Sequence, residues 1–139
     1  MFKTVFFIFI LSCFQLWGQS YVKWNVSIDK ACKILNIDAE FEEGWHIYSQ
    51  YQDENAGPIP TSITVEYGDQ SLTRLAEPKP IVYFDKNFGG DVLYFEDYVR
   101  FRAALPSVYS GDVLVNVVYM MCNDEGCLPP IKKEFKLSI

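Results

Sequence analysis

The chain has 139 residues, half of them hydrophobic and 22% charged, which suits one folded domain and excludes a disordered chain or a multidomain enzyme. Twelve basic and eighteen acidic residues give a net charge of −6, which repels a phosphate backbone and excludes nucleic acid as a partner. The single histidine, His46, rules out a histidine-rich zinc centre, and we expect no resident metal or other cofactor. Aromatic residues make up 17% of the chain, a bias that favours strands over helices.

The first twenty residues have the composition of a secretory signal peptide. Lys3 is their only charge, residues 5–14 are almost wholly apolar, and Gly18-Gln19-Ser20 supplies small residues for cleavage. The apolar run of roughly ten residues is too short to span a bilayer, which takes about 20. We therefore predict a leader at residues 1–20, cleaved after Gly18 or Ser20. The remaining domain, residues 21–139, then has a net charge of −7, because Lys3 is lost.

Lipidation at Cys13 is the alternative fate of this leader. The residues Ile10-Leu11-Ser12-Cys13 partly fit the pattern of small residues before a lipid-bearing cysteine. Either route takes the protein out of the cytosol, into a compartment in which disulfides form.

Residues 21–139 show the period-two alternation that is typical of half-buried strands. Apolar side chains alternate through 24–28, 35–41, 63–67, 93–105 and 113–121, and a last strand passes through Phe135 and Leu137. Turns rich in glycine, proline, asparagine and aspartate separate these runs, and no stretch has helical periodicity. About seven to nine strands in roughly 120 residues predict an all-β fold, an immunoglobulin-like antiparallel β-sandwich.

Three cysteines belong to the folded domain, and two of them are close in sequence. Cys122 and Cys127 flank the tip of a predicted hairpin, where facing residues lie about 4.5–5.5 Å apart, so we expect them to form a disulfide. Cys32 lies out of phase with the apolar residues of the strand that follows it, and we expect a free thiol at the surface. A purely structural bridge is one interpretation of the pair, although so small a ring gains little stability from loop closure.

Three segments of the chain together resemble one family. The run Tyr119-Met120-Met121-Cys122-Asn123-Asp124-Glu125-Gly126-Cys127-Leu128-Pro129-Pro130 is similar to the active-site hairpin of the N-terminal periplasmic domain of DsbD-type thiol:disulfide reductases. Two further matches follow the family's order: Gly44-Trp45-His46-Ile47-Tyr48-Ser49 with Gly57-Pro58-Ile59-Pro60-Thr61, and Phe88-Gly89-Gly90-Asp91-Val92. In this family the domain is an immunoglobulin-like sandwich that takes electrons from a thioredoxin-like partner and passes them to periplasmic disulfide proteins.

The resemblance implies that Cys122 and Cys127 are the catalytic pair of a periplasmic thiol-disulfide oxidoreductase. In the family the second cysteine joins the partner, which makes Cys127 the nucleophile and Cys122 the resolving thiol. The chain ends at Ile139 without the family's membrane and thioredoxin-like domains, so we expect the electron donor to be another chain. Asp124 and Glu125 disfavour a thiolate nearby, which predicts a pair on the reducing side.

The resemblance also implies neighbours of the cysteine pair. His46 and Tyr48 match positions near it, although a histidine without catalytic duty and a core tyrosine are the simpler interpretations. The segment around Phe88 matches a loop that covers the cysteines as a cap, and burial of Phe88 in the end of the sandwich is the alternative. The family's acidic residues before this aromatic are replaced here by Lys86 and Asn87, and the best-known members have one more residue between the cysteines.

Two other functions fit part of the sequence. A Cu(I)-handling module could use soft ligands from Met120, Met121, Cys122, Cys127 and His46. Against this, adjacent residues of a strand point to opposite faces, so Met120 and Met121 cannot both reach one ion. The last hypothesis is a non-catalytic immunoglobulin-like binding domain with a structural disulfide.

Overall fold

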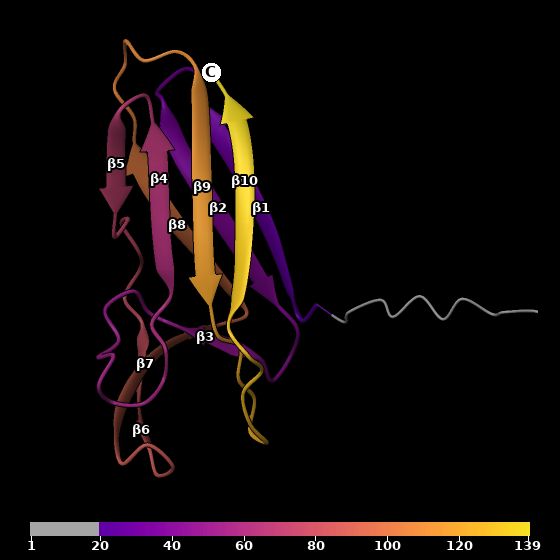
Figure 1. The fold of residues 1–139 in the computed structure, drawn as a ribbon. Helices are drawn as coiled ribbons and strands as arrows, with labels where there is room; N and C mark the ends of the chain where they lie inside the picture. Colours follow the sequence, from indigo (N-terminus) through magenta and orange to yellow (C-terminus); the bar gives the residue numbers. More distant parts are fainter. Residues whose placement is uncertain (1–19) are drawn as a thin grey trace, which may run out of the picture.

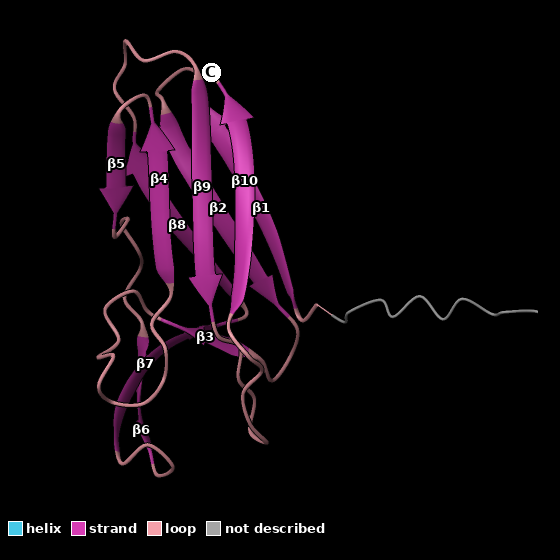
Figure 2. Cartoon of the chain, in the orientation of Figure 1, coloured by secondary structure: helices cyan, strands magenta, loops and turns pink. Residues whose placement is uncertain are grey.

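The computed structural model describes residues 20–139 as strands joined by turns and loops, with no helix in that range (Figures 1 and 2). It follows that no helix there is long and apolar enough to cross a membrane. The expected leader and Cys13 lie in residues 1–19, outside the described part of the chain.

Ten strands of residues 20–139 pair antiparallel in three sheets. In chain order the strands are β1 (Val22–Asp29), β2 (Ile34–Phe41), β3 (His46–Tyr48), β4 (Ser62–Tyr67), β5 (Gln70–Thr73), β6 (Ile81–Asp85), β7 (Gly90–Glu96), β8 (Tyr98–Ala104), β9 (Asp112–Tyr119) and β10 (Ile131–Ser138). The first sheet has the order β1-β2-β8, the second β10-β9-β4-β5 and the third β3-β7-β6.

The first two sheets face each other and enclose the main hydrophobic core (Figure 1). In β9 the inward residues Val113, Val115 and Val117 are fully buried and alternate with more exposed ones, as the sequence predicts. Leu35 of β2 and Phe101 of β8 belong to the same core and are equally buried. Burial of each such side chain contributes about 1.5–3 kcal/mol to stability. The predicted immunoglobulin-like antiparallel β-sandwich is confirmed.

The run of alternating apolar residues at 93–105 forms two strands, β7 and β8, that belong to different sheets. Asp97 has a φ of 62°, a left-handed conformation that aspartate tolerates better than most residues, and it separates β7 from β8. β7 then pairs with β3, while β8 pairs with β2. The backbone carbonyl of Asp97 accepts a hydrogen bond of 2.9 Å from the amide of Phe41, which fixes the crossing point to β2.

The prediction of seven to nine strands is too low, because three short strands lack the alternating pattern. β3 has three residues, β5 is a four-residue strand with little apolar surface, and β6 is a run of consecutive apolar residues. Two of these three, β3 and β6, flank β7 in the third sheet. This sheet lies at the end of the molecule opposite the C-terminus, the end at which the segment between β9 and β10 also turns (Figure 1).

Buried amide side chains attach the loop after β3 to the rest of the fold. Gln50 and Leu75 exchange two hydrogen bonds of 3.0 Å, one in each direction between the side chain and the backbone. The Gln52 Oε1 atom accepts a hydrogen bond of 2.6 Å from the amide of Leu93 in β7. Because both glutamines are about 95% buried, these bonds replace water that the burial excludes. The loop is therefore held against the third sheet.

Candidate functional site

The two cysteines close a tight turn between β9 and β10. Cys122 and Cys127 form a disulfide with their Cα atoms 4.0 Å apart and are paired as an isolated antiparallel bridge, so the predicted pairing is confirmed. The Asn123 side chain organises the tip, because its Oδ1 atom accepts hydrogen bonds from the amides of Glu125 and Gly126 at 2.9 and 3.0 Å. The Asn123 amide also donates a hydrogen bond of 2.9 Å to the Gly126 carbonyl, so side chain and backbone together hold the tip of the turn.

The two sulfur-bearing residues differ in access to solvent. Cys122 is 2% exposed and packs in a small apolar cluster, whereas Cys127 is exposed. Cys127 is therefore the more accessible of the two residues to a thiol from another molecule. Access makes the two ends of the disulfide chemically distinct even though they form one bond.

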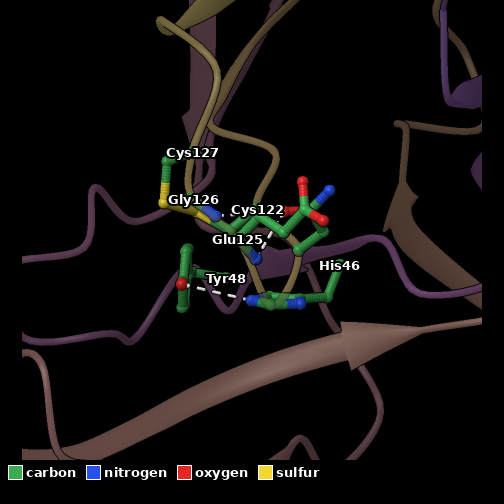
Figure 3. Close-up of a disulfide and its surroundings, with 7 residues drawn as sticks. His46, Tyr48, Cys122, Glu125, Gly126 and Cys127 are labelled. Carbon is green, nitrogen blue, oxygen red and sulfur yellow. Dashed lines mark hydrogen bonds between the residues drawn. A yellow bond between two sulfur atoms is a disulfide. The ribbon is translucent and has the colours of Figure 1, made fainter.

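His46 lies directly beside Cys122 through its backbone. The two residues exchange both amide-to-carbonyl hydrogen bonds, at 3.0 and 3.1 Å, as an antiparallel pair. These bonds attach the third sheet, through β3, to the cysteine turn. The His46 Nε2 atom lies 3.2 Å from the Tyr48 hydroxyl oxygen in a hydrogen bond, and Figure 3 shows both side chains next to the disulfide.

The inner side of the disulfide rests on an apolar cluster. Tyr48, Val92 and Met120 are buried together with Cys122, and Tyr94 packs against them. Met120 belongs to this cluster, whereas its neighbour Met121 belongs to the main core, which confirms that the two methionines point to opposite faces. In residues 20–139 no three His, Cys, Asp or Glu side chains are grouped so that they could hold a metal ion.

Burial controls the protonation of the two polar neighbours. Desolvation lowers the pKa of His46 below its ordinary value of 6.5, and the carboxylates of Asp124 and Asp85 oppose this shift. Desolvation raises the pKa of Tyr48 to about 12, and Asp85 adds to that shift. At neutral pH the imidazole and the phenol are therefore both uncharged. The surroundings of Cys122 are apolar and neutral, with acidic groups only at their edge.

Phe88 lies in the turn between β6 and β7, and its ring packs on Gly57 of the loop after β3. A Cβ atom at Gly57 would lie 2.2 Å from Phe88 Cδ1, so only glycine leaves room for the ring at this position. Asp85 fixes the turn by accepting hydrogen bonds from the amides of Asn87 and Phe88, at 2.8 and 3.3 Å. Phe88 is 37% exposed, and its role as a cap over the cysteines stays a prediction.

Cys32 lies far from this turn in the sequence and is an exposed free thiol, as expected. Its amide and that of Ala31 donate hydrogen bonds to the Asp29 side chain at 3.3 and 2.9 Å. These bonds lower the pKa of the Asp29 carboxyl. We find no role for Cys32 in the chemistry of the pair.

The structure adds residues that the sequence did not single out for the site. Tyr94 contacts the cluster around Cys122, and its ring centroid lies 5.0 Å from that of His46. Asp85 influences the protonation of both His46 and Tyr48. The sequence did contain a signal for the strand that ends at Asp85. The residues from Ile81 to Phe84 are an apolar run that ends at a turn, which is typical of a strand.

A comparison with known families agrees with this geometry. The family model described as "Thiol:disulfide interchange protein DsbD, N-terminal" matches residues 18–139. The chain belongs to the DsbD N-terminal domain family. No curated protein matches the sequence significantly.

Solved DsbD N-terminal domains have the same fold. The domain of Neisseria meningitidis DsbD in its reduced form is 16% identical, with a TM-score of 0.59, and the match covers 85% of each chain. A complex between the DsbD and PilB N-terminal domains of that organism matches at 14% identity and a TM-score of 0.63, covering 83% of this chain and 80% of the other. The N-terminal periplasmic domain of Proteus mirabilis ScsB matches at 14% identity and a TM-score of 0.51, covering 85% of this chain and 44% of the other.

Proposed function

We propose that this DsbD-type domain is a periplasmic thiol:disulfide interchange protein that accepts electrons from a thioredoxin-like chain and passes them to periplasmic disulfide proteins. The observation that carries the proposal is the difference in access between the cysteines. Cys127 is exposed and open to attack, while Cys122 is 2% exposed and held behind it. Disulfide exchange needs one sulfur that meets the partner and a second that stays close enough to resolve the mixed disulfide.

The first half of the cycle reduces this chain. A thiolate of the donor attacks Cys127 Sγ, the bond to Cys122 breaks, and Cys122 leaves as a thiolate that takes up a proton. The donor's second thiolate then attacks the donor's first sulfur, which is bonded to Cys127 in the mixed disulfide. Cys127 is released as a thiolate and takes up a proton. The donor becomes a disulfide and this chain a dithiol, so two electrons and two protons have moved.

The second half of the cycle returns the electrons to a client. The Cys127 thiolate attacks a client disulfide and forms a mixed disulfide, while one client sulfur leaves as a thiolate. Cys122, deprotonated, then attacks Cys127 Sγ and releases the second client sulfur. The disulfide between Cys122 and Cys127 is restored, and the client is now a dithiol.

The charges near the turn favour a reducing pair. Asp124 and Glu125 are exposed carboxylates within the six-residue turn, and like charge disfavours a thiolate. A pair is oxidising when its thiolate is strongly stabilised, so these acids support a carrier of electrons over an oxidase.

The periplasmic location rests on the predicted leader. The expected mature N-terminus lies between Gln19 and Tyr21, and the intact mass of the exported protein measures it. A mass that fits a lipidated chain starting at Cys13 would replace this prediction with the lipoprotein alternative.

Trapping with a single-cysteine thioredoxin tests the proposed roles. The probe is thioredoxin with its second active-site cysteine changed to serine and its first coupled to thionitrobenzoate. Both variants of this chain carry Cys32→Ser, because the exposed Cys32 thiol would also react. In the Cys122→Ser variant, the Cys127 thiolate attacks the thioredoxin sulfur, so coloured thionitrobenzoate is released and a covalent complex accumulates.

The Cys127→Ser variant is the matched control. Its remaining thiol at Cys122 is buried, so we expect little complex in the same time. The reversed pattern, with more complex from Cys127→Ser, would show that the two roles are exchanged. Absence of complex from both variants would contradict thiol:disulfide interchange with a thioredoxin-like partner.

A further inference from the structure

The strand β6 exposes four consecutive large apolar side chains. Ile81, Val82, Tyr83 and Phe84 are 41%, 57%, 55% and 57% exposed, and β6 is the outer strand of the sheet β3-β7-β6. Sheet edges usually carry charged residues that prevent pairing with other chains. An apolar edge of this kind marks an interaction site.

One face of β6 continues a row of side chains that begins at the disulfide. Residues directly opposite each other on antiparallel strands share a face. Tyr48, Tyr94 and Ile81 are opposite one another on β3, β7 and β6, and Val92 and Tyr83 form the next pair. We name these five residues the apolar row. Its inner members, Tyr48 and Val92, are buried with Cys122, and its outer members are the half-buried Tyr94 and the exposed β6 residues Ile81 and Tyr83.

The cysteine turn borders the same face. A cleft of about 590 Å³ is lined by Tyr83 and Tyr94 from the sheet and by Asn123 and Asp124 from the turn. Neither cysteine lines this cleft, but Asn123 and Asp124 belong to the turn that the disulfide closes. A partner bonded to Cys127 and extending along this turn would therefore meet the outer part of the apolar row.

The rim of the cleft is acidic. Three of its lining residues, Asp85, Glu96 and Asp124, carry carboxylates, against one ammonium group from Lys86. Charges of opposite sign on two partners steer encounter and set their orientation. The rim therefore suits a partner that presents lysine or arginine beside an apolar segment.

We propose that the outer part of the apolar row, Ile81, Tyr83 and Tyr94, is the docking surface for the thioredoxin-like partner. The partner lays an apolar segment with flanking basic side chains across this surface while it is bonded to Cys127. The inference rests on the proposed function, and it adds to it the surface and the charge by which the partner is recognised. The apolar row is continuous with the residues packed on the disulfide, which favours a partner that reacts with the disulfide. A second copy of the chain is disfavoured, because the acidic rims of the two copies would repel each other.

Substitutions on the two faces of β6 test the proposal. Ile81→Ser with Tyr83→Ser removes the front face, and Val82→Ser with Phe84→Ser removes the rear face of the same strand at similar exposure. Reduced thioredoxin is the probe, and the rate at which it reduces the disulfide is measured. We expect the front variant to react about tenfold more slowly, as for the loss of a central interface contact, and the rear variant to react like the wild type.

Dithiothreitol provides the reference rate, because a small dithiol needs no docking surface. All three proteins are expected to react equally with it, and unchanged thermal midpoints verify that the exposed substitutions leave the fold intact. A front variant as fast as the wild type with thioredoxin, or a rear variant as slow as the front one, would overturn the docking surface. A wild type that thioredoxin reduces no faster than dithiothreitol does would instead contradict the proposed function.

Two short cysteine peptides test the charge of the partner. The peptides share an apolar residue beside the cysteine and differ only in carrying lysine or glutamate next to it. We expect the lysine peptide to exchange with the disulfide several-fold faster at low salt, with the difference shrinking as salt screens the rim. Equal rates, or a faster glutamate peptide, would overturn the assignment of a basic partner.

Discussion

The two ends of this molecule differ in the length of their strands and in how far their apolar side chains are buried. The sandwich has mostly long strands, such as β2 and β9 with eight residues each, and its inward side chains are fully buried. The third sheet has strands of three to seven residues, and the four apolar residues of its outer strand β6 are each 41–57% exposed. The disulfide lies where these two regions meet, attached to the third sheet by the backbone pair of His46 and Cys122.

We expect this contrast to separate the stability of the fold from the proposed disulfide chemistry. The main core lies between the two large sheets, so we expect the fold to persist when the disulfide is opened. The end that carries the disulfide leaves Cys127 and the apolar strand β6 exposed, which costs stability locally and would give the proposed partners access. A domain that exchanges between dithiol and disulfide would need a scaffold that does not depend on the bond.

The largest expected effect is on the sandwich. Phe101→Ala removes a ring that is 0% exposed in the main core, and we expect the free energy of unfolding to fall by about 3–5 kcal/mol in urea titrations. Val108→Ala, at a residue that is 92% exposed, is the control and should change it little. The Phe101 ring also packs on Phe95 of β7, with the ring centroids 6.0 Å apart, and we expect the rate of disulfide reduction by dithiothreitol to change far less than the stability.

Opening the disulfide should have a smaller effect. Closing a ring of this size restricts the unfolded chain by an amount worth about 2 kcal/mol at most. We therefore expect the reduced protein to unfold in urea with a free energy lower by no more than this. A loss as large as that of Phe101→Ala would mean that the bond is a structural staple.

The cap prediction concerns reactivity with little change in stability. If Phe88 shields the cysteines, Phe88→Ala in a Cys32→Ser background should speed alkylation of the reduced pair several-fold. The thermal midpoint should stay nearly unchanged, because Phe88 is already 37% exposed. An unchanged alkylation rate, or a large loss of stability, would mean that Phe88 serves only to pack on Gly57.

The smallest expected effect is a difference in pH dependence between the two regions. The pKa of His46 is lowered by burial, so between its folded and unfolded values the unfolded chain binds more protons. The free energy of unfolding should therefore fall as the pH drops below about 6.5, and His46→Gln should remove this part of the slope. Urea titrations between about pH 7.5 and about pH 5.5 measure it. An identical slope in the variant would contradict the burial of a neutral imidazole.

The sandwich should respond at lower pH. The pKa of the Asp38 carboxyl is lowered, first by its hydrogen bonds from Arg100, against the opposing effect of burial. Its contribution to stability is present above its ordinary value of 3.8 and is lost as the pH falls through the lower folded value. Asp38→Asn should flatten the acid part of the curve and leave the part near 6.5 unchanged.

The sequence predicts the sandwich well because strand burial is a local pattern. In β9 every second residue from Val113 to Tyr119 is buried, and the alternation alone predicts it. The disulfide could be predicted for the same reason, since Cys122 and Cys127 are five residues apart on one hairpin.

Contacts across the third sheet could not be predicted from local pattern. The neighbourhood of Cys122 depends on the register of β3, β7 and β6, which brings Tyr48 opposite Tyr94. The contact of Phe88 with Gly57 joins two loops, and no local pattern in the sequence predicts that these loops meet. The exposure of β6 could not be predicted either. A run of apolar residues indicates a buried strand, and the sequence does not show that no other element covers this one.

The midpoint potential of the pair between Cys122 and Cys127 tests the central claim most directly. It is measured by equilibrating the domain with glutathione or thioredoxin buffers and counting alkylated cysteines, in a Cys32→Ser background. A carrier that exchanges electrons with thioredoxin-like proteins should have a midpoint between about −270 and about −180 mV. A midpoint below about −300 mV would identify a structural disulfide and contradict the proposed function.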